Sequence, residues 1–290
     1  MEILKTYKLY IGGQFPRTES GRSYQIKSAA GQAIANACLG SKKDIRNAVQ
    51  AARKAQTGWA NKSGFNRSQI IYRIAEMLEA RKVQFIDELM LMGQTEQSAV
   101  EEVRLSIDRL VYYAGWADKF QALSSSVNPV SSSHFNFSVP EPMGVVGVVA
   151  CQKTALLGLI SQTIPLLVGG NTVVVIANTL KALSAISFAE VLATSDVPGG
   201  VVNILTGDVA EMLPTLAGHM DVNALSLSTI PEDLSKSAQE AAIDNLKRCQ
   251  LYHSDFSAPQ NQGLQFITDF QEIKTTWHPI EQVASGIGGY

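Results

Sequence analysis

One turn in the middle of the chain carries the residue types that could do covalent chemistry. Cys151, Gln152 and Lys153 follow an apolar run typical of a buried strand, and a helical pattern begins a few residues later. A cysteine at the carboxyl end of a strand, near a helix N-terminus and a lysine, is a candidate nucleophile. Lys153 could instead form a Schiff base or hold an acidic ligand such as phosphate. The simpler alternative, which we favour, is that Cys151 packs as a small apolar residue and Lys153 is a solvated turn residue.

Other reactive residue types are scattered. Glu101 and Glu102, followed by Arg104, could form a carboxylate pair, but a solvated helix face explains them better. Cys38 and Cys249 fall in strand-like segments, where core packing accounts for them, and no CxxC spacing suggests a disulfide framework or a zinc site. The four histidines are dispersed without HxxH spacing, so we expect no metal.

The elements that position this turn alternate between strand and helix. Val145–Ala150 and Thr172–Ile176 are uninterrupted β-branched runs separated by a helical stretch, a pattern typical of parallel strands buried on both faces. Three further strands follow, each after a helix. Their expected ranges are Val201–Leu205, Ala224–Leu227 and Cys249–Tyr252. The sequence therefore predicts an α/β fold with a doubly wound, Rossmann-like parallel sheet of about five strands.

The first 126 residues predict short strands followed by helices. Ser41 begins a helix that ends near Trp59, and a second helix runs from about Asn66 toward a break at Gly93. A third is expected from Glu96 to about Leu123, with Val100, Val103, Ile107, Leu110 and Val111 as its apolar residues.

Two alternating segments lie outside this pattern. The segment from His134 to Pro140 alternates with period two, and a second such strand runs from Phe270 to His278. The second strand has no neighbour in the sequence to pair with, so it must pair with the Phe135–Val139 strand or with another chain.

Composition and charge argue against a nucleic-acid-binding, membrane or secreted protein. The chain has 290 residues, of which 46% are hydrophobic, and a net charge of −2, which gives no electrostatic case for nucleic acid or for an anionic membrane. The N-terminus lacks the layout of a signal peptide, and the apolar runs are too short to cross a membrane. We therefore expect a cytoplasmic protein.

Several segments, in order along the chain, resemble the aldehyde dehydrogenase superfamily. These are Tyr10–Gly13, Val49–Trp59, Glu141–Val148, Gly170–Val174, Pro198–Gly207, His219–Val222 and Glu272–Trp277. The resemblance implies that the hairpin near Phe135 and the C-terminal strand form an oligomerisation element. The residues it assigns to that element are Phe135, Phe137, Val139, Ile273, Lys274, Thr275 and Trp277.

The resemblance fails at the family's catalytic and cofactor positions. Lys153 stands where the family has an Asn that helps to stabilise an oxyanion, and Tyr252 stands where it has the base Glu. Ile176 and Thr179 replace a Lys and a Glu that hold the cofactor's ribose. The remaining replacements are Val209 and Leu213 for two glycines beside the cofactor, and Thr229 and Ile230 for the Gly-Ser at the cofactor phosphates.

The segment that carries the family's catalytic Cys is also missing. The chain passes from about Asp255 directly to about Gly263, which skips a whole domain. The replacements at the ribose remove charge-assisted hydrogen bonds, and Leu213 places side-chain carbons where the cofactor would approach the backbone. We therefore expect no cofactor and no catalytic residue.

These observations predict four regions and one function. Residues 1–126 form the N-terminal strands and helices, 127–142 an oligomerisation hairpin, 143–255 the Rossmann-like core, and 256–290 a linker with the C-terminal strand. We expect a catalytically inactive, dehydrogenase-like subunit that assembles with itself or with a complete aldehyde dehydrogenase. The alternative is an NAD- or NADP-dependent aldehyde oxidoreductase subunit whose catalytic thiol comes from another chain.

Overall fold

A five-stranded parallel sheet forms the centre of the computed structural model, which describes residues 3–253 and 255–280. Its strand order is β10-β9-β6-β7-β8, and every neighbouring pair is parallel. The strands are β6 (Val145–Val149), β7 (Thr172–Ile176), β8 (Val202–Leu205), β9 (Ala224–Ser228) and β10 (Arg248–Tyr252). All but the edge strand β10 are buried along their whole length, as their β-branched sequences require. The predicted fold class is confirmed.

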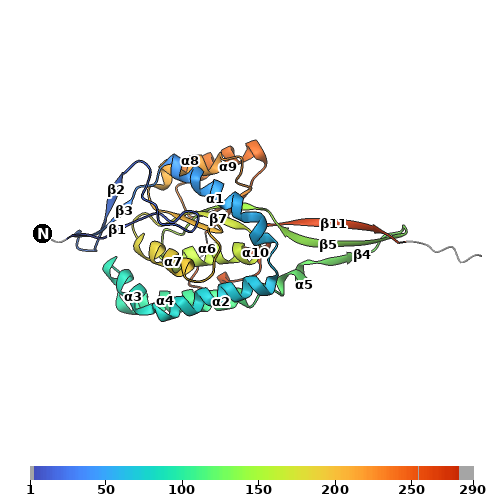
Figure 1. Cartoon of the computed structure of the whole chain (residues 1–290), viewed down its shortest axis with the longest axis horizontal. Helices are drawn as coiled ribbons and strands as arrows, with labels where there is room; N and C mark the ends of the chain where they lie inside the picture. The colour runs from blue at the N-terminus through green and yellow to red at the C-terminus, as the bar shows by residue number, and fades with distance from the viewer. Residues whose placement is uncertain (1–2, 254, 281–290) are drawn as a thin grey trace, which may run out of the picture.

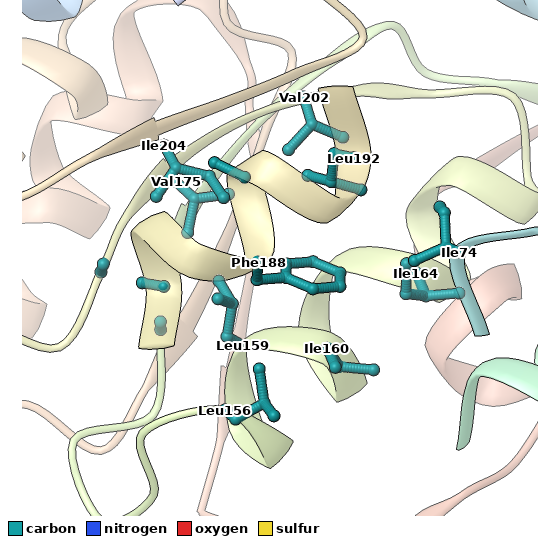
Figure 2. Close-up of a cluster of buried hydrophobic side chains, with 14 of the residues drawn as sticks. Ile74, Leu156, Leu159, Ile160, Ile164, Val175, Phe188, Leu192, Val202 and Ile204 are labelled. Carbon is teal, nitrogen blue, oxygen red and sulfur yellow. The ribbon is translucent and has the colours of Figure 1, made fainter. Parts of the chain in front are cut away.

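Helices cover both faces of this sheet (Figure 1). The crossover helices are α6 (Leu157–Val168), α7 (Leu183–Ala193), α8 (Val209–Ala217) and α9 (Glu232–Ala242), the last followed by the 3₁₀ turn η1 (Ile243–Asn245). On one face, Phe188 of α7 packs among Leu156, Leu159 and Ile160 and the strand residue Val175 (Figure 2). α1, α8 and α9 cover the other face with a separate apolar cluster.

The N-terminal region adds a small sheet and a layer of helices. β1 (Thr6–Tyr7), β3 (Ala33–Cys38) and β2 (Ser23–Lys27) form the sheet, in that order. The helices are α1 (Lys42–Ala60), α2 (Gly64–Ala80), α3 (Lys82–Leu91), α4 (Glu96–Ala114) and α5 (Phe120–Ser124). The Ser41 hydroxyl and the Asp44 carboxylate form a reciprocal capping box at the start of α1, which confirms that predicted helix start.

Two helix expectations need correction. The stretch between Asn66 and Gly93 holds two helices, because the chain leaves helical geometry at Arg81. The third predicted helix ends at Ala114 before Gly115, and α5 is a separate turn. Val100 and Val111 of that helix are exposed, so the apolar face is narrower than the sequence suggests.

A three-stranded antiparallel sheet projects from the body, and we call it the arm (Figure 1). It consists of β4 (Ser126–Asn128), β5 (His134–Pro142) and β11 (Gln271–Pro279), in the order β11-β5-β4. The pairing of β11 with β5 confirms the first of the two expected partners for this strand. The connection from β10 to β11 contains η2 (Pro259–Asn261) and α10 (Gln265–Thr268). Within the described residues, no helix has the length and apolar character needed to span a membrane.

Candidate functional site

A cleft of 650 Å³ opens at the carboxyl edge of the central sheet. Its lining combines residues that follow β6 and β9 with the first residues of α8 and α9, the position where doubly wound folds bind ligands. The lining residues are Gln152, Asp208, Val209, Ala210, Thr229, Ile230, Pro231, Asp233 and Leu234. The structure thus brings together three of the positions singled out from sequence, Val209, Thr229 and Ile230.

The other replaced cofactor positions lie elsewhere. Ile176 and Leu213 are fully buried and belong to the apolar cluster beneath α1 and α8. Thr179 lines a separate recess beside Tyr24, where its hydroxyl donates to the Gly207 carbonyl and its own carbonyl accepts from the Tyr24 hydroxyl. The replacements therefore divide between a packed core and an open cleft.

Acidic side chains stand where the helices of the cleft begin. Asp208 caps α8 by accepting the Ala210 N–H at 2.9 Å, and Glu232 and Asp233 occupy the first turn of α9. Helix N-termini favour negative charge and are common phosphate sites, but here carboxylates already supply that charge. None of the described residues that line the cleft is a cation. A dinucleotide's pyrophosphate would meet repulsion at both helix starts, so these residues do not fit it.

The side chains of Gln162 and Glu102 occupy the buried hydrogen-bonding groups of the turn that follows β6. Cys151 is only 5% exposed, and its N–H donates to the Gln162 side chain at 2.8 Å. The N–H groups of Ala155, Leu156 and Leu157, at the start of α6, all donate to one oxygen of Glu102. The free N–H groups at the start of α6 are therefore already bonded to a buried carboxylate, so they are not available to an external anion.

Glu102 corrects the expectation of a solvated carboxylate face. Its neighbour Glu101 is exposed and bonded to Arg104, as expected, but Glu102 points inward and is buried. Lys153 is exposed, its carbonyl accepts from the Lys181 ammonium, and its charge helps to lower the pKa of Asp255. Sequence periodicity alone could not separate the two glutamates, because the partner of Glu102 lies more than fifty residues away.

Tyr252, at the position of the family's base, is a structural residue. Its hydroxyl donates to Asp269 at 2.7 Å and so ties β10 to the segment that precedes β11. Burial and the contact with the Asp269 carboxylate raise the pKa of Tyr252 above its ordinary value. Tyr252 is therefore unsuited to act as a general base near neutral pH.

The connection between β10 and β11 is anchored by a residue that the sequence did not reveal. Arg109 of α4 donates to Ser161 of α6 at 2.6 Å, to the Phe256 carbonyl at 2.8 Å and to the Gln262 side chain at 3.0 Å. Tyr113 donates to the Gly263 carbonyl. Burial lowers the pKa of Arg109. The short route from β10 to β11 is thus held by buried hydrogen bonds.

The arm gathers all the residues predicted for oligomerisation, on two different faces. Phe135, Phe137 and Val139 share one face with Val127 of β4, and they line a shallow recess of 360 Å³. Lys274 lies on this face and bonds Glu141 at 3.0 Å. The opposite face carries Ile273, Thr275 and Trp277, and Thr275 bonds the Ser138 hydroxyl at 2.8 Å.

Large apolar side chains are exposed on both faces of the arm. The exposed fractions are 68% for Val127, 46% for Phe135, 60% for Ile273 and 56% for Trp277. Exposed apolar clusters of this kind are typical of surfaces through which proteins associate.

Comparison with known proteins decides the family. The model of the aldehyde dehydrogenase family matches residues 16–254. The chain belongs to the aldehyde dehydrogenase family. It is 31% identical over 261 residues to cytosolic 10-formyltetrahydrofolate dehydrogenase of Xenopus laevis, covering 87% of this chain and 28% of that protein. It is also 31% identical over 254 residues to omega-crystallin of Enteroctopus dofleini, covering 86% and 50% of the two chains.

Solved structures agree with this family assignment. The NAD+ complex of an aldehyde dehydrogenase from Bacillus cereus superimposes with a TM-score of 0.81 at 25% identity, over 85% of this chain and 50% of that one. PnpE from Pseudomonas sp. WBC-3 also gives a TM-score of 0.81, at 26% identity, over 86% and 50% of the two chains. This aldehyde dehydrogenase family chain therefore spans about half the length of these relatives.

The three thiols of this family member all lie in buried or half-buried positions. Cys38 and Cys151 are buried. Cys249 lies half-buried in β10, where burial raises its pKa to about 11. Because the thiolate is the reactive form, a raised pKa leaves little of it at neutral pH.

Proposed function

We propose that this chain is a catalytically inactive, aldehyde dehydrogenase-like subunit that works in the cytoplasm by assembling with other subunits through its arm. The single observation that carries the proposal is the arm itself, a projecting sheet with exposed apolar side chains on both faces. The partner is a second copy of this chain or a complete aldehyde dehydrogenase.

The state of the catalytic positions supports the inactive part of the proposal. The turn after β6 places Lys153 in solvent and Cys151 in the core, and Tyr252 bonds Asp269. Oxidation of an aldehyde through a thioester requires an activated thiolate, donors for the oxyanion and a base in one place. None of these three residues lines the cleft at the carboxyl edge of the sheet, which supports an inactive subunit.

Native mass spectrometry tests the assembly. The chain is measured alone and mixed with a complete aldehyde dehydrogenase from the same organism, and the proposal expects an oligomer in at least one case. Phe135→Asp and Trp277→Asp, one on each face of the arm, show which face takes part, and at least one of them should weaken the oligomer by burying a charge in the contact. Phe65→Asp is the matched control, since Phe65 is equally exposed but lies on α2. A monomer under all conditions refutes the proposal.

The open cleft beside Val209 and Ile230 favours a second candidate function. A subunit that binds NAD or NADP there could take part in aldehyde oxidation with a thiol supplied by another chain. This candidate predicts thermal stabilisation by NAD or NADP. At a hundred times the dissociation constant, binding adds about 2.7 kcal/mol to the unfolding free energy. Our proposal expects no shift, because Asp208 and Asp233 repel the pyrophosphate.

A further inference from the structure

The outer edge of β11 has no partner strand among the described residues. At about 3.4 Å per residue, its nine residues present roughly 30 Å of unpaired backbone. Exposed edges are usually guarded by free charges, prolines or bulges. Here Glu272 bonds Arg248 and Lys274 bonds Glu141, the pairing of β11 with β5 runs without a register shift, and the one proline of β11, Pro279, stands at its last position. The edge is therefore open to another strand.

Hydrogen bonds at both ends of the arm show which residues face outward. The Ile280 N–H donates to the Ser133 carbonyl, and the Met143 N–H donates to the Phe270 carbonyl, both in register with the β11–β5 pairing. Because such bonds alternate along an antiparallel pair, the even-numbered residues of β11 bond to β5. The odd-numbered residues Ile273, Thr275 and Trp277 direct their N–H and C=O groups to the free edge, and Pro279 at the end of the strand offers only its C=O there.

We propose that β11 pairs in an antiparallel manner with β11 of a second copy of this chain, about a two-fold axis at Thr275. The inference rests on the proposed assembly function and names its partner and register. In this register Ile273 lies opposite the second copy's Trp277, and Glu272 lies opposite its His278, an acceptor facing a donor. Both cross-strand pairs are therefore complementary.

The two neighbouring registers are less favourable. An axis at Lys274 places that lysine opposite itself, and like charges directly opposite each other destabilise a sheet. An axis at Thr276 places Lys274 opposite His278, so a cation replaces the Glu272 carboxylate as the neighbour of that imidazole. Of these three registers, only the axis at Thr275 keeps the Glu272–His278 pair and separates the two Lys274 side chains.

The shape of the molecule permits this pairing. The arm projects away from the body, so antiparallel pairing places the two bodies at opposite ends of a joint six-stranded sheet (Figure 1). A two-fold axis perpendicular to that sheet brings the faces that carry Val127 and Phe135 to the same side. On that side of the joint sheet the two recesses lie on the outer strands, and the polar residues Lys274, Thr276 and His278 of both β11 strands lie between them.

Disulfide trapping between different variants tests the register. Glu272→Cys and His278→Cys chains, both carrying Cys249→Ser, are mixed under oxidising conditions. A disulfide needs Cα atoms within about 7 Å, and residues opposite each other across an antiparallel pair satisfy this. Within one variant the two cysteines would lie about 20 Å apart, six residues along the strand. The mixture should form linked dimers, and either variant alone should not.

Two further mixtures report the other registers. Glu272→Cys with Thr276→Cys would link about an axis at Lys274, and Lys274→Cys with His278→Cys would link about an axis at Thr276. Thr275→Pro removes an outward N–H without touching the β11–β5 bonds, so it should abolish the dimer while the circular dichroism spectrum is retained. Linkage in another register, or an unchanged dimer in Thr275→Pro, overturns the inference.

Native mass spectrometry separates this inference from the function on which it rests. An oligomer in which the Glu272→Cys and His278→Cys chains do not become linked overturns the strand pairing and leaves the assembly function standing. A complex formed only with a complete aldehyde dehydrogenase has the same consequence. A monomer in every mixture removes both.

Discussion

Removal of the Glu102 carboxylate is the sharpest test of how the turn after β6 is built. One of its oxygens accepts the N–H groups of Ala155, Leu156 and Leu157 at 2.9, 2.7 and 3.1 Å, and the other accepts from the Gln94 amide at 2.6 Å. All three donors of α6 are buried. Glu102→Ala would leave them without a partner at the end of a helix inside the protein.

The expected loss is large. A buried donor that loses its partner costs about 1–3 kcal/mol, and a carboxylate at a helix N-terminus stabilises that end by up to about 2 kcal/mol. These contributions overlap, and water can enter part of the vacated space. We therefore expect Glu102→Ala to lower the unfolding free energy by about 3–5 kcal/mol, in line with the removal of one partner from other buried charged contacts. Glu102→Gln keeps an acceptor but loses the charge, so its loss should be smaller.

Urea unfolding followed by circular dichroism at one fixed protein concentration measures these differences. Glu101→Ala is the matched control, because Glu101 is the preceding residue but is exposed and bonded only to Arg104. It should leave the midpoint unchanged. If Glu102→Ala behaves like Glu101→Ala, the buried capping role is wrong.

Three more predictions follow from buried contacts. Gly158→Ala places a Cβ 2.4 Å from the Cys151 Cβ and should lower the unfolding free energy measured in urea by about 1–3 kcal/mol. Gly58→Ala, whose new Cβ meets no neighbour within 4 Å, should instead stabilise α1 by about 0.5–1 kcal/mol. Equal effects of the two variants would contradict this packing. Burial raises the pKa of Glu88 in the folded protein, so the stability that its neutral form contributes is complete below the ordinary pKa and is lost as the pH rises through the raised pKa. The unfolding free energy of Glu88→Gln should therefore increase relative to that of the wild type as the pH rises. A difference that does not depend on pH would contradict the burial of this carboxyl. Arg109→Met should accelerate amide hydrogen exchange in residues 255–263 while the central sheet stays protected, and unchanged exchange there would show that the anchor is unnecessary.

Many of the elements were predictable because their signals are local. The runs Val145–Val149 and Thr172–Ile176 are apolar at nearly every position, which only a strand covered on both faces requires. Ser41 and Asp44 are three residues apart and cap α1 within a single turn. The break at Arg81 was not predicted, because the apolar pattern runs on from α2 into α3 and the sequence there contains neither Gly nor Pro.

The arm shows the same division between local pattern and tertiary contact. Alternation in β5 and β11 predicted strands, and the resemblance to the family grouped their residues as one surface. Only the register, in which Ile273 lies opposite Pro140, separates Phe135 and Phe137 from Ile273 and Trp277 on opposite faces. A register is a relation between segments more than a hundred residues apart, which no local pattern contains.

The sequence by itself indicated the family and the succession of strands and helices, and it predicted replacements at the family's catalytic and cofactor positions. Tertiary structure decided what those replacements do. Ile176 and Leu213 are buried in the core, whereas Val209 and Ile230 line an open cleft. Glu102 is buried, whereas its neighbour Glu101 is exposed. The physical reason is that burial depends on which distant backbone and side-chain groups surround a residue, and side-chain type and spacing only limit the choices.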